Sequence, residues 1–181
     1  MQFQSVAASV NLYLCTLMQS MMNLKPLISL LLLFSVVAAN GNIIKAAFDK
    51  SAFYNAMASD NMEAINNQLT IVKTSSINEK EAYEGAMLMK KAGLVTSAKE
   101  KINLFKAGRI KLEAAIKKNK ENVEFCFLRL IIQEHAPKIV NYDDNIKTDV
   151  AAIRSNYKIL HPVVQQAISD YSKKSKNLKP L

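Results

Sequence analysis

Tryptophan is absent from this 181-residue sequence, and it contains only four glycines, four prolines and two cysteines. Half of the residues are apolar and 22% are charged. So little glycine and proline beside so large an apolar share excludes collagen-like, low-complexity and wholly disordered chains. A chain of this length is therefore expected to fold as one domain.

Acidic residues are missing from the first 39 positions, where Lys25 is the one charged side chain. The stretch Pro26–Ala39 is uncharged and mostly apolar, and it ends in small residues. It is shorter than the roughly 20 residues of a membrane-spanning helix, but it has the length of the apolar region of a secretory signal peptide. Residues 1–39 are therefore predicted to be a signal peptide that is cleaved before Asn40. An uncleaved membrane anchor is the alternative.

The segment before Lys25 lacks the positive charge that normally opens a signal peptide. Translation from Met22 would instead give an ordinary signal, Met-Asn-Leu-Lys followed by the apolar run. Residues 1–21 are accordingly predicted to be a start-site artefact. The remaining protein is expected to be exported, either periplasmic or secreted, with no membrane span after cleavage.

Cysteine is too scarce for an internal disulfide in the exported part, where Cys126 would be the one cysteine left. Stability must then come from packing. The neighbours of Cys126 are apolar, which raises the pKa of a thiol, so this side chain is expected to fill core space and not to act as a nucleophile. The sequence has no Asn-x-Ser/Thr glycosylation site, which fits a bacterial exported protein.

Apolar residues recur at helical spacing along the rest of the chain, and turn residues separate the stretches. The expected helix N-caps are Asp60, Asn78, Thr96 or Ser97, and Asn122. Short connections make neighbouring helices antiparallel, so the predicted fold class is all-α, with six to seven helices in a bundle or a solenoid of helical hairpins. The predicted helices are residues 43–59, 61–72, 79–93, 97–118, 123–136, 144–160 and 162–173.

The predicted helix 123–136 has apolar residues all around its axis, which is typical of a central buried helix. Its composition also suits a buried strand. Asn122 as an N-cap, Glu124 in the first turn and Pro137 as a terminator favour the helix.

Two arginines are candidate buried charges. Arg109 lies on the apolar stripe of helix 97–118, and Arg129 lies within the apolar stretch 123–136. An unpaired buried charge is costly, so Arg109 is expected to reach the rim or pair with a carboxylate, and Arg129 to have partners on other helices. Gly108 lowers helix propensity and is expected to let another helix approach closely. The stripe itself consists of Ala98, Ile102, Phe105, Arg109, Leu112 and Ile116.

Residues 108–125, GRIKLEAAIKKNKENVEF, place a glycine and three apolar residues before a polar turn and a new helix. This stretch resembles a degenerate tetratricopeptide repeat over at most residues 78–136. It lacks the usual tryptophan, and Lys120 stands where the turn proline belongs. The resemblance implies a short α-solenoid and supplies no catalytic residue. The whole chain also looks like small exported all-helical bacterial proteins of uncharacterised type.

No HExxH, CxxC or GxSxG motif occurs, so the chain is predicted not to be an enzyme and to carry no cofactor or metal. Glu134, His135, Asp143 and Asp144 form a weak polar cluster in the sequence. They could make a metal or acid/base site, which would support a hydrolase as a further alternative. A solvated turn with helix caps is the simpler interpretation.

Basic residues outnumber acidic ones by 24 to 15, and eight of them lie between Lys99 and Lys120 beside two glutamates. Such a face could meet nucleic acid, anionic lipid or an acidic protein, or could simply be solvated. Nucleic acid is not expected as a partner of an exported protein. The last residues, 172–181, are predicted to form a basic disordered tail. The candidate anion-binding residues are Lys99, Lys106, Lys117, Lys118 and Lys120.

These features predict a single exported helical domain, residues 40–171, that acts through its surface. The leading hypothesis is a protein-interaction or structural module of the cell envelope with an unidentified protein partner. The alternative is binding of acidic lipid or another polyanion by the lysine-rich helix of residues 99–120.

Overall fold

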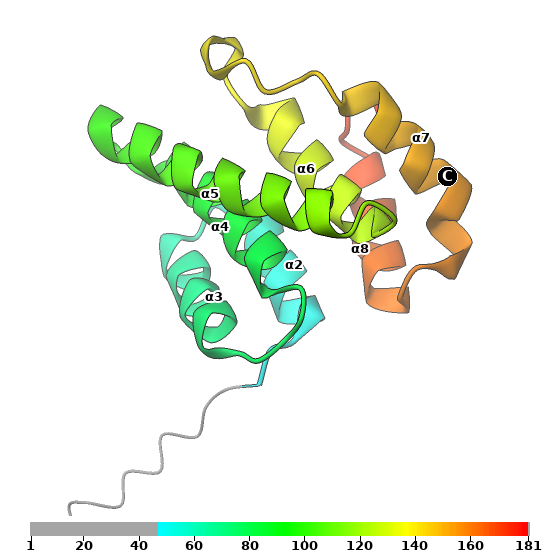
Figure 1. The fold of residues 1–181 in the computed structure, drawn as a ribbon, viewed down its shortest axis with the longest axis horizontal. Helices are drawn as coiled ribbons and strands as arrows, with labels where there is room; N and C mark the ends of the chain where they lie inside the picture. The colour runs from blue at the N-terminus through cyan, green and yellow to red at the C-terminus, as the bar shows by residue number, and fades with distance from the viewer. Residues whose placement is uncertain (1–46, 181) are drawn as a thin grey trace, which may run out of the picture. The chain divides into compact units, whose positions relative to one another are not determined.

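Seven α-helices and two short 3₁₀ turns make up residues 47–180, the part of the chain that the computed structural model describes (Figure 1). No strand occurs in this part, which confirms the prediction of an all-α fold. The predicted signal peptide and the proposed start-site artefact lie outside the described residues. The helices are α2 (Lys50–Ala58), α3 (Met62–Thr74), α4 (Lys80–Leu94), α5 (Ala98–Lys118), α6 (Val123–His135), α7 (Ile146–Asn156) and α8 (Pro162–Ser172), and the 3₁₀ turns are η2 (Lys138–Val140) and η3 (Tyr157–Ile159).

Side-chain caps fix where most of these helices begin. Ser97 and Asn122 accept hydrogen bonds from backbone N–H groups in the first turns of α5 and α6, as predicted. The predicted cap Asp60 is wrong by one residue, because Asn61 accepts the N–H groups of Glu63 and Ala64.

Three other predicted boundaries also shift. Residues 47–49 are not helical, and α2 begins at Lys50, because the Asp49 carboxylate accepts the N–H of Ser51 and caps the helix there; the first residues of the predicted helix, 43–46, lie outside the described part. Asn78 is not the cap of α4, which starts at Lys80 after Glu79. Helix α7 is shorter than predicted, because residues 144–145 form a turn before it and η3 replaces its last turn.

Helices α4 and α5 form an antiparallel hairpin whose backbones meet at two glycines. A Cβ atom placed on Gly108 would lie 2.5 Å from the carbonyl oxygen of Gly85 and 2.7 Å from Cγ of Met89. A Cβ on Gly85 would lie 2.7 Å from the carbonyl oxygen of Gly108. These distances are too short for any side chain, so the predicted close approach at Gly108 is confirmed.

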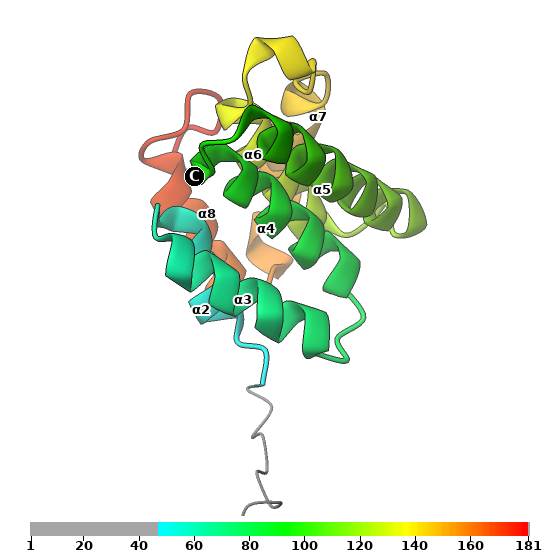
Figure 2. The ribbon, with the colours of Figure 1, turned by 90° about the vertical axis from the view of Figure 1, so that its left-hand side faces the viewer.

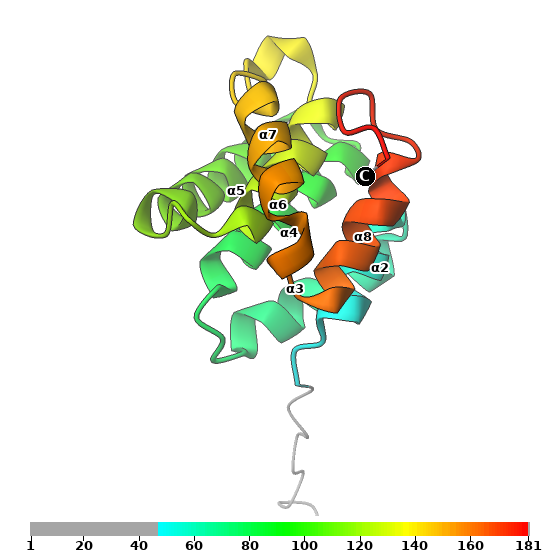
Figure 3. The same ribbon diagram turned by 90° about the vertical axis from the view of Figure 1, so that its right-hand side faces the viewer.

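Helix α6 lies in the middle of the described unit and contacts α4, α5 and α7. Figure 2 shows α3, α4 and α5 nearest the viewer, whereas Figure 3 shows α7 and α8 nearest the viewer with α5 behind them. Phe127, Leu128 and Leu130 of α6 are fully buried. The prediction of a central buried helix is therefore confirmed for residues 123–135, and the strand alternative is wrong.

A buried ion pair joins α6 to its neighbours on both sides. Arg129 donates from Nε and Nη2 to the two carboxylate oxygens of Asp149 on α7, at 2.8 and 2.7 Å, and from Nη1 to Glu113 on α5 at 3.0 Å. The predicted cross-helix partners of Arg129 are thus present. Arg109 is only half-buried and pairs with no carboxylate in the described part; its guanidinium lies 4.7 Å from the ring centre of Tyr142, which replaces the carboxylate as its partner.

A second buried carboxylate ties the start of the described unit to its centre. Glu124, in the first turn of α6, accepts hydrogen bonds from the hydroxyl groups of Tyr54 at 3.0 Å and Tyr83 at 2.6 Å and from Nζ of Lys50 at 2.6 Å. Burial, followed by the Glu124 charge, raises the pKa of both tyrosines well above 10. Both therefore remain neutral hydrogen-bond donors, which holds α2 and α4 against α6.

The prediction of a disordered tail from residue 172 is wrong for the described residues up to Pro180. Leu178 is fully buried in the core, which gives this basic segment an apolar anchor. Glu134 of α6 accepts hydrogen bonds from Ser175 Oγ and from the backbone N–H and Nδ2 of Asn177. The segment after α8 therefore packs against α6, held by one leucine and one carboxylate.

Candidate interaction surface on helix α5

Helix α5 turns one side toward α4 and leaves the other side exposed. Gly108 and Leu112 are buried on the inner side. Four residues spaced four, three and four apart face outward, which at about 100° per residue places them on one line along the helix. Ile110 is 71% exposed in the middle of this line. We call the line, Asn103, Ala107, Ile110 and Ala114, the α5 seam.

The predicted apolar stripe of α5 is only partly buried. Residues 140–142 cover part of it: the backbone of Val140 and Asn141 lies next to Arg109, and the ring of Tyr142 packs edge-on against Phe105, with 5.7 Å between the ring centres. This cover does not extend to the first turn of α5. Ala98 is exposed and Ile102 is 52% exposed, which corrects the prediction that both lie in the core.

Three of the five lysines predicted as an anion-binding face follow one edge of the α5 seam. Lys99, Lys106 and Lys117 are exposed, and no carboxylate of the described residues lies within ion-pair distance of them. Lys118 is one residue further on and therefore lies at the opposite edge, and Lys120 follows the end of the helix. Three of the five predicted lysines therefore form one row along the α5 seam, and Lys118 and Lys120 lie apart from this row.

Lys111 lies on the same helix but is paired with carboxylates. Its Nζ lies 2.7 Å from Glu81 and 3.2 Å from Glu84, both on α4. The hydrogen bond that Lys111 donates to Glu81 raises the pKa of Lys111, and its effect outweighs that of burial, which alone would lower the pKa. This lysine serves the α4–α5 hairpin, in contrast to the exposed row.

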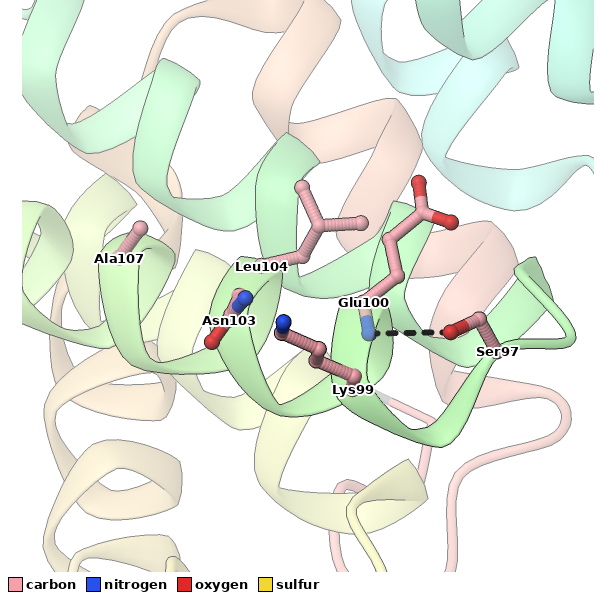
Figure 4. Close-up of a pocket in the computed structure, with 6 residues that line it drawn as sticks. All are labelled: Ser97, Lys99, Glu100, Asn103, Leu104 and Ala107. Carbon is pink, nitrogen blue, oxygen red and sulfur yellow. Dashed lines mark hydrogen bonds between the residues drawn. The ribbon is translucent and has the colours of Figure 1, made fainter.

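A shallow hollow with a volume of about 350 Å³ lies along the first half of the α5 seam. Figure 4 shows the side chains that line it. All six lining residues come from α5 and its cap, and five of them are exposed. A hollow with walls from one helix cannot bury most of a small molecule, as enzyme pockets do. It can receive one side chain of a protein that lies along α5. The lining residues are Ser97, Lys99, Glu100, Asn103, Leu104 and Ala107.

The residues of the weak polar cluster have separate hydrogen-bond partners or none in the described part of the chain. Glu134 is taken up by the C-terminal segment, and the Nδ1 atom of His135 lies 2.8 Å from the carbonyl oxygen of Ile131. Asp143 and Asp144 are exposed, and no hydrogen bond or ion pair between residues 47 and 180 joins any two of the four. No group of three or more histidine, cysteine or acidic residues in that range could hold a metal ion. The described residues therefore contain no site in which the four side chains could act together, as the hydrolase alternative requires.

Cys126 is buried beside the Arg129–Asp149 pair. Burial, with a smaller contribution from the Asp149 charge, raises the pKa of its thiol to about 11. The side chain is therefore protonated at neutral pH, in line with its predicted role as a core residue.

Sequence reasoning named the lysines but missed the α5 seam between them. The signal was present, because Asn103, Ala107, Ile110 and Ala114 recur at helical spacing opposite Leu112. Three of these four residues are small or polar, however, and such residues look like ordinary solvated positions until the structure shows an isoleucine exposed among them.

Comparison with protein-family models, with curated proteins and with solved structures finds no match for this chain. None of the helices between residues 47 and 180 is both long enough and apolar enough to cross a membrane.

Proposed function

We propose that this protein is a protein-interaction module of the cell envelope that binds a partner protein along the α5 seam. The observation that supports the proposal best is Ile110, which is 71% exposed at the centre of a line of small residues. Burying one such side chain in an interface contributes about 1.5–3 kcal/mol. The hollow beside Ala107 offers a second contact point on the same line.

The small residues of the seam determine what kind of segment fits. Ala107 and Ala114 flank Ile110 one turn away on either side, and their short side chains allow a partner helix to approach to about 8–10 Å between axes. The lysine row at the edge would guide an acidic partner and set its orientation more than its affinity. The proposed partner segment is therefore a helix with an apolar side chain for the hollow and carboxylates opposite Lys99, Lys106 and Lys117.

Site-specific photo-crosslinking in the source cell tests this proposal. A photoreactive residue at Ala107 should give one dominant covalent adduct with another protein, because this position lies on the seam. The same residue at Asn67, an exposed position on α3, is the matched control and should give none. Adding I110D should abolish the Ala107 adduct, with the far-UV circular dichroism unchanged. Equal adducts at both positions, or an Ala107 adduct that survives I110D, would contradict the proposal.

Export is part of the same proposal. It is supported by the apolar run Pro26–Ala39 and its small-residue end. The native protein recovered from the crosslinking experiment should begin at Asn40 on N-terminal sequencing. A mature chain that retains Pro26–Ala39 would favour the uncleaved anchor instead.

Binding of anionic lipid by the lysine row of α5 is the second candidate. The observation in its favour is that Lys99, Lys106 and Lys117 are exposed and unpaired within the described residues. This candidate predicts that K99E/K106E abolishes binding to anionic vesicles, whereas the leading proposal allows such binding to persist.

A further inference from the structure

The outer side of α7 carries a second row of basic residues, on the other side of α6 from α4. Lys147, Ala151, Arg154 and Lys158 are spaced four, three and four apart and are all exposed; Lys158 lies in η3, which directly follows α7. The remaining exposed residues of α7 are Thr148 and Ser155, so its exposed surface has no acidic side chain. The one acid of α7, Asp149, is 1% exposed and paired with Arg129.

The C-terminal segment adds a fourth cation to this row. Arg154 donates from Nη2 to the carbonyl oxygen of Lys179 at 3.0 Å, and the buried Leu178 next to it holds the segment in place. Residues 173–180 contain no acid. Folding thus brings together residues that are distant in the sequence. We call Lys147, Arg154, Lys158 and Lys179 the α7 basic face.

Two exposed acidic residues lie at one end of this face, and Glu134, which accepts the backbone N–H of Asn177, lies against the C-terminal segment that forms the other end. Asp143 and Asp144 precede α7 on the side of Lys147 and weaken the positive potential there. The other end, with Arg154, Lys158 and Lys179, is also the end that bears Ile159, which is 81% exposed. An exposed isoleucine beside a group of cations is the combination that binds the interface of an anionic bilayer, where the apolar side chain enters the acyl boundary and the cations meet the headgroups.

We propose that the α7 basic face, with Ile159, binds the surface of a membrane that contains anionic lipids. Lysine side chains suit this role because their apolar stems can lie along the interface while the ammonium groups reach the phosphates. A protein partner is a poorer fit, because binding hot spots are rich in Trp, Tyr and Arg, and the one arginine here is engaged with the Lys179 carbonyl.

This inference does not depend on the proposed function, because it uses a different surface. Figure 2 shows α5 toward the viewer and Figure 3 shows α7 toward the viewer, so the two helices lie on different sides of the unit. A protein that rests on a membrane through α7 would still present the α5 seam for a partner.

Vesicle co-sedimentation with charge-matched variants tests the inference. The probe is a vesicle of phosphatidylcholine with about one third phosphatidylglycerol, compared with pure phosphatidylcholine, and the protein is the chain as purified from its source cell. K158E/K179E reverses two exposed lysines and keeps the contact between Arg154 and the Lys179 carbonyl. K99E/K106E changes the net charge equally but on α5. Each lysine near an anionic surface contributes about 1 kcal/mol, so K158E/K179E should weaken binding by roughly 30-fold or more.

The expected pattern has three parts. The unaltered protein binds the anionic vesicles and not the neutral ones, and raising the salt concentration releases it. K158E/K179E loses binding whereas K99E/K106E retains most of it. I159S lowers the affinity by roughly 10-fold at constant charge, because it removes the apolar contact.

Other outcomes overturn the inference. Equal losses in both double variants would show that net charge alone drives binding, and loss only in K99E/K106E would assign the lipid surface to α5. Tight binding of soluble polyglutamate by the α7 basic face without vesicle binding would indicate an acidic protein as its partner. Circular dichroism of each variant excludes unfolding as the cause of a loss.

Discussion

At the scale of single residues, the contact between Gly85 and Gly108 is the most restrictive feature of the fold. The nearest atoms are backbone atoms, Met89 Cγ and Leu112 Cβ, so little can move aside for a methyl group. The helix-propensity gain of about 1 kcal/mol that alanine brings over glycine is therefore outweighed by the 1–3 kcal/mol or so that overpacking costs.

We predict that Gly108→Ala lowers the free energy of unfolding by up to about 2 kcal/mol, the difference between these two effects. Gly93 is the matched control, because it also lies in this hairpin and a Cβ atom placed on it would have no other atom within 4 Å. Gly93→Ala should leave stability unchanged or raise it by up to about 1 kcal/mol. Urea titration followed by circular dichroism measures both, and equal effects of the two substitutions would contradict the close approach.

Individual side chains differ in how far sequence alone predicts their surroundings. The surroundings of Arg129 and Cys126 are predicted correctly because a charge or a thiol in an apolar run has few tolerable environments. For Arg109 the sequence leaves two environments open, the rim or a carboxylate partner, and the structure shows the rim. The exposure of Ile102 is not predicted, because the residues that cover the helical stripe extend along part of its length only. The cover depends on residues 140–142, whose path follows from the left-handed backbone of Asn141 (φ 47°) and not from any periodicity.

At the scale of elements, the C-terminal segment depends on the ionisation of Glu134. Burial alone would raise the pKa of Glu134, but hydrogen bonds from Tyr171, Asn177 and Ser175 outweigh burial and hold it below its ordinary value of 4.5. A carboxylate with a lowered pKa contributes stability that is present above its unfolded-state pKa and is lost as the pH falls through its folded-state pKa. The segment should therefore be firmly docked at neutral pH and loosen in acid.

We predict that the hydrogen-exchange protection of the Asn177 and Leu178 amides falls as the pH drops below about 4.5, after correction for intrinsic exchange rates. In E134Q the protection should be lower at neutral pH and should no longer change over that range. D170N is the control, since Asp170 is exposed and its partners are Gln166 and Lys173. A pH step that persists in E134Q would show that another group controls the segment.

Most helices, but not this segment, could be predicted from the sequence. The helices α5 and α6 have the predicted bounds within one residue, because Ser97, Asn122 and Pro137 are strong local signals. The segment 173–180 carries four lysines and a single apolar anchor, which is the composition of a tail. Its docking depends on Glu134, far away in the sequence, and a distant hydrogen-bond partner leaves no local pattern.

At the scale of the whole described unit, one hydrophobic core extends through all seven helices and the C-terminal segment. Residues from α2 to α8, and Leu178 after them, belong to the same buried cluster. The Glu124 and Arg129 contacts link helices on both sides of α6 through charged and polar groups. Separating α2 or α4 from α6 would take a hydrogen-bond partner from the buried Glu124 carboxylate, and separating α5 or α7 from α6 would take a carboxylate from Arg129.

We therefore predict that the domain unfolds in one cooperative step. Tyrosine fluorescence is a suitable second probe, since tryptophan is absent and the tyrosines of the described unit are distributed from α2 to α8. Its urea transition should coincide with that of far-UV circular dichroism, within the error of the midpoints. Transitions with separate midpoints would indicate that the two sides of α6 unfold independently.

The backbone contact between α4 and α5 also has a consequence for evolution. A larger side chain at either glycine would push the helices apart, and no change at the other position could restore the fit, because the obstructing atoms are mainly backbone. Homologues that have diverged beyond recognition by overall sequence similarity should therefore keep glycine at both positions. Gly85, two residues after Tyr83, and Gly108, two residues after Lys106, are a practical signature for finding them.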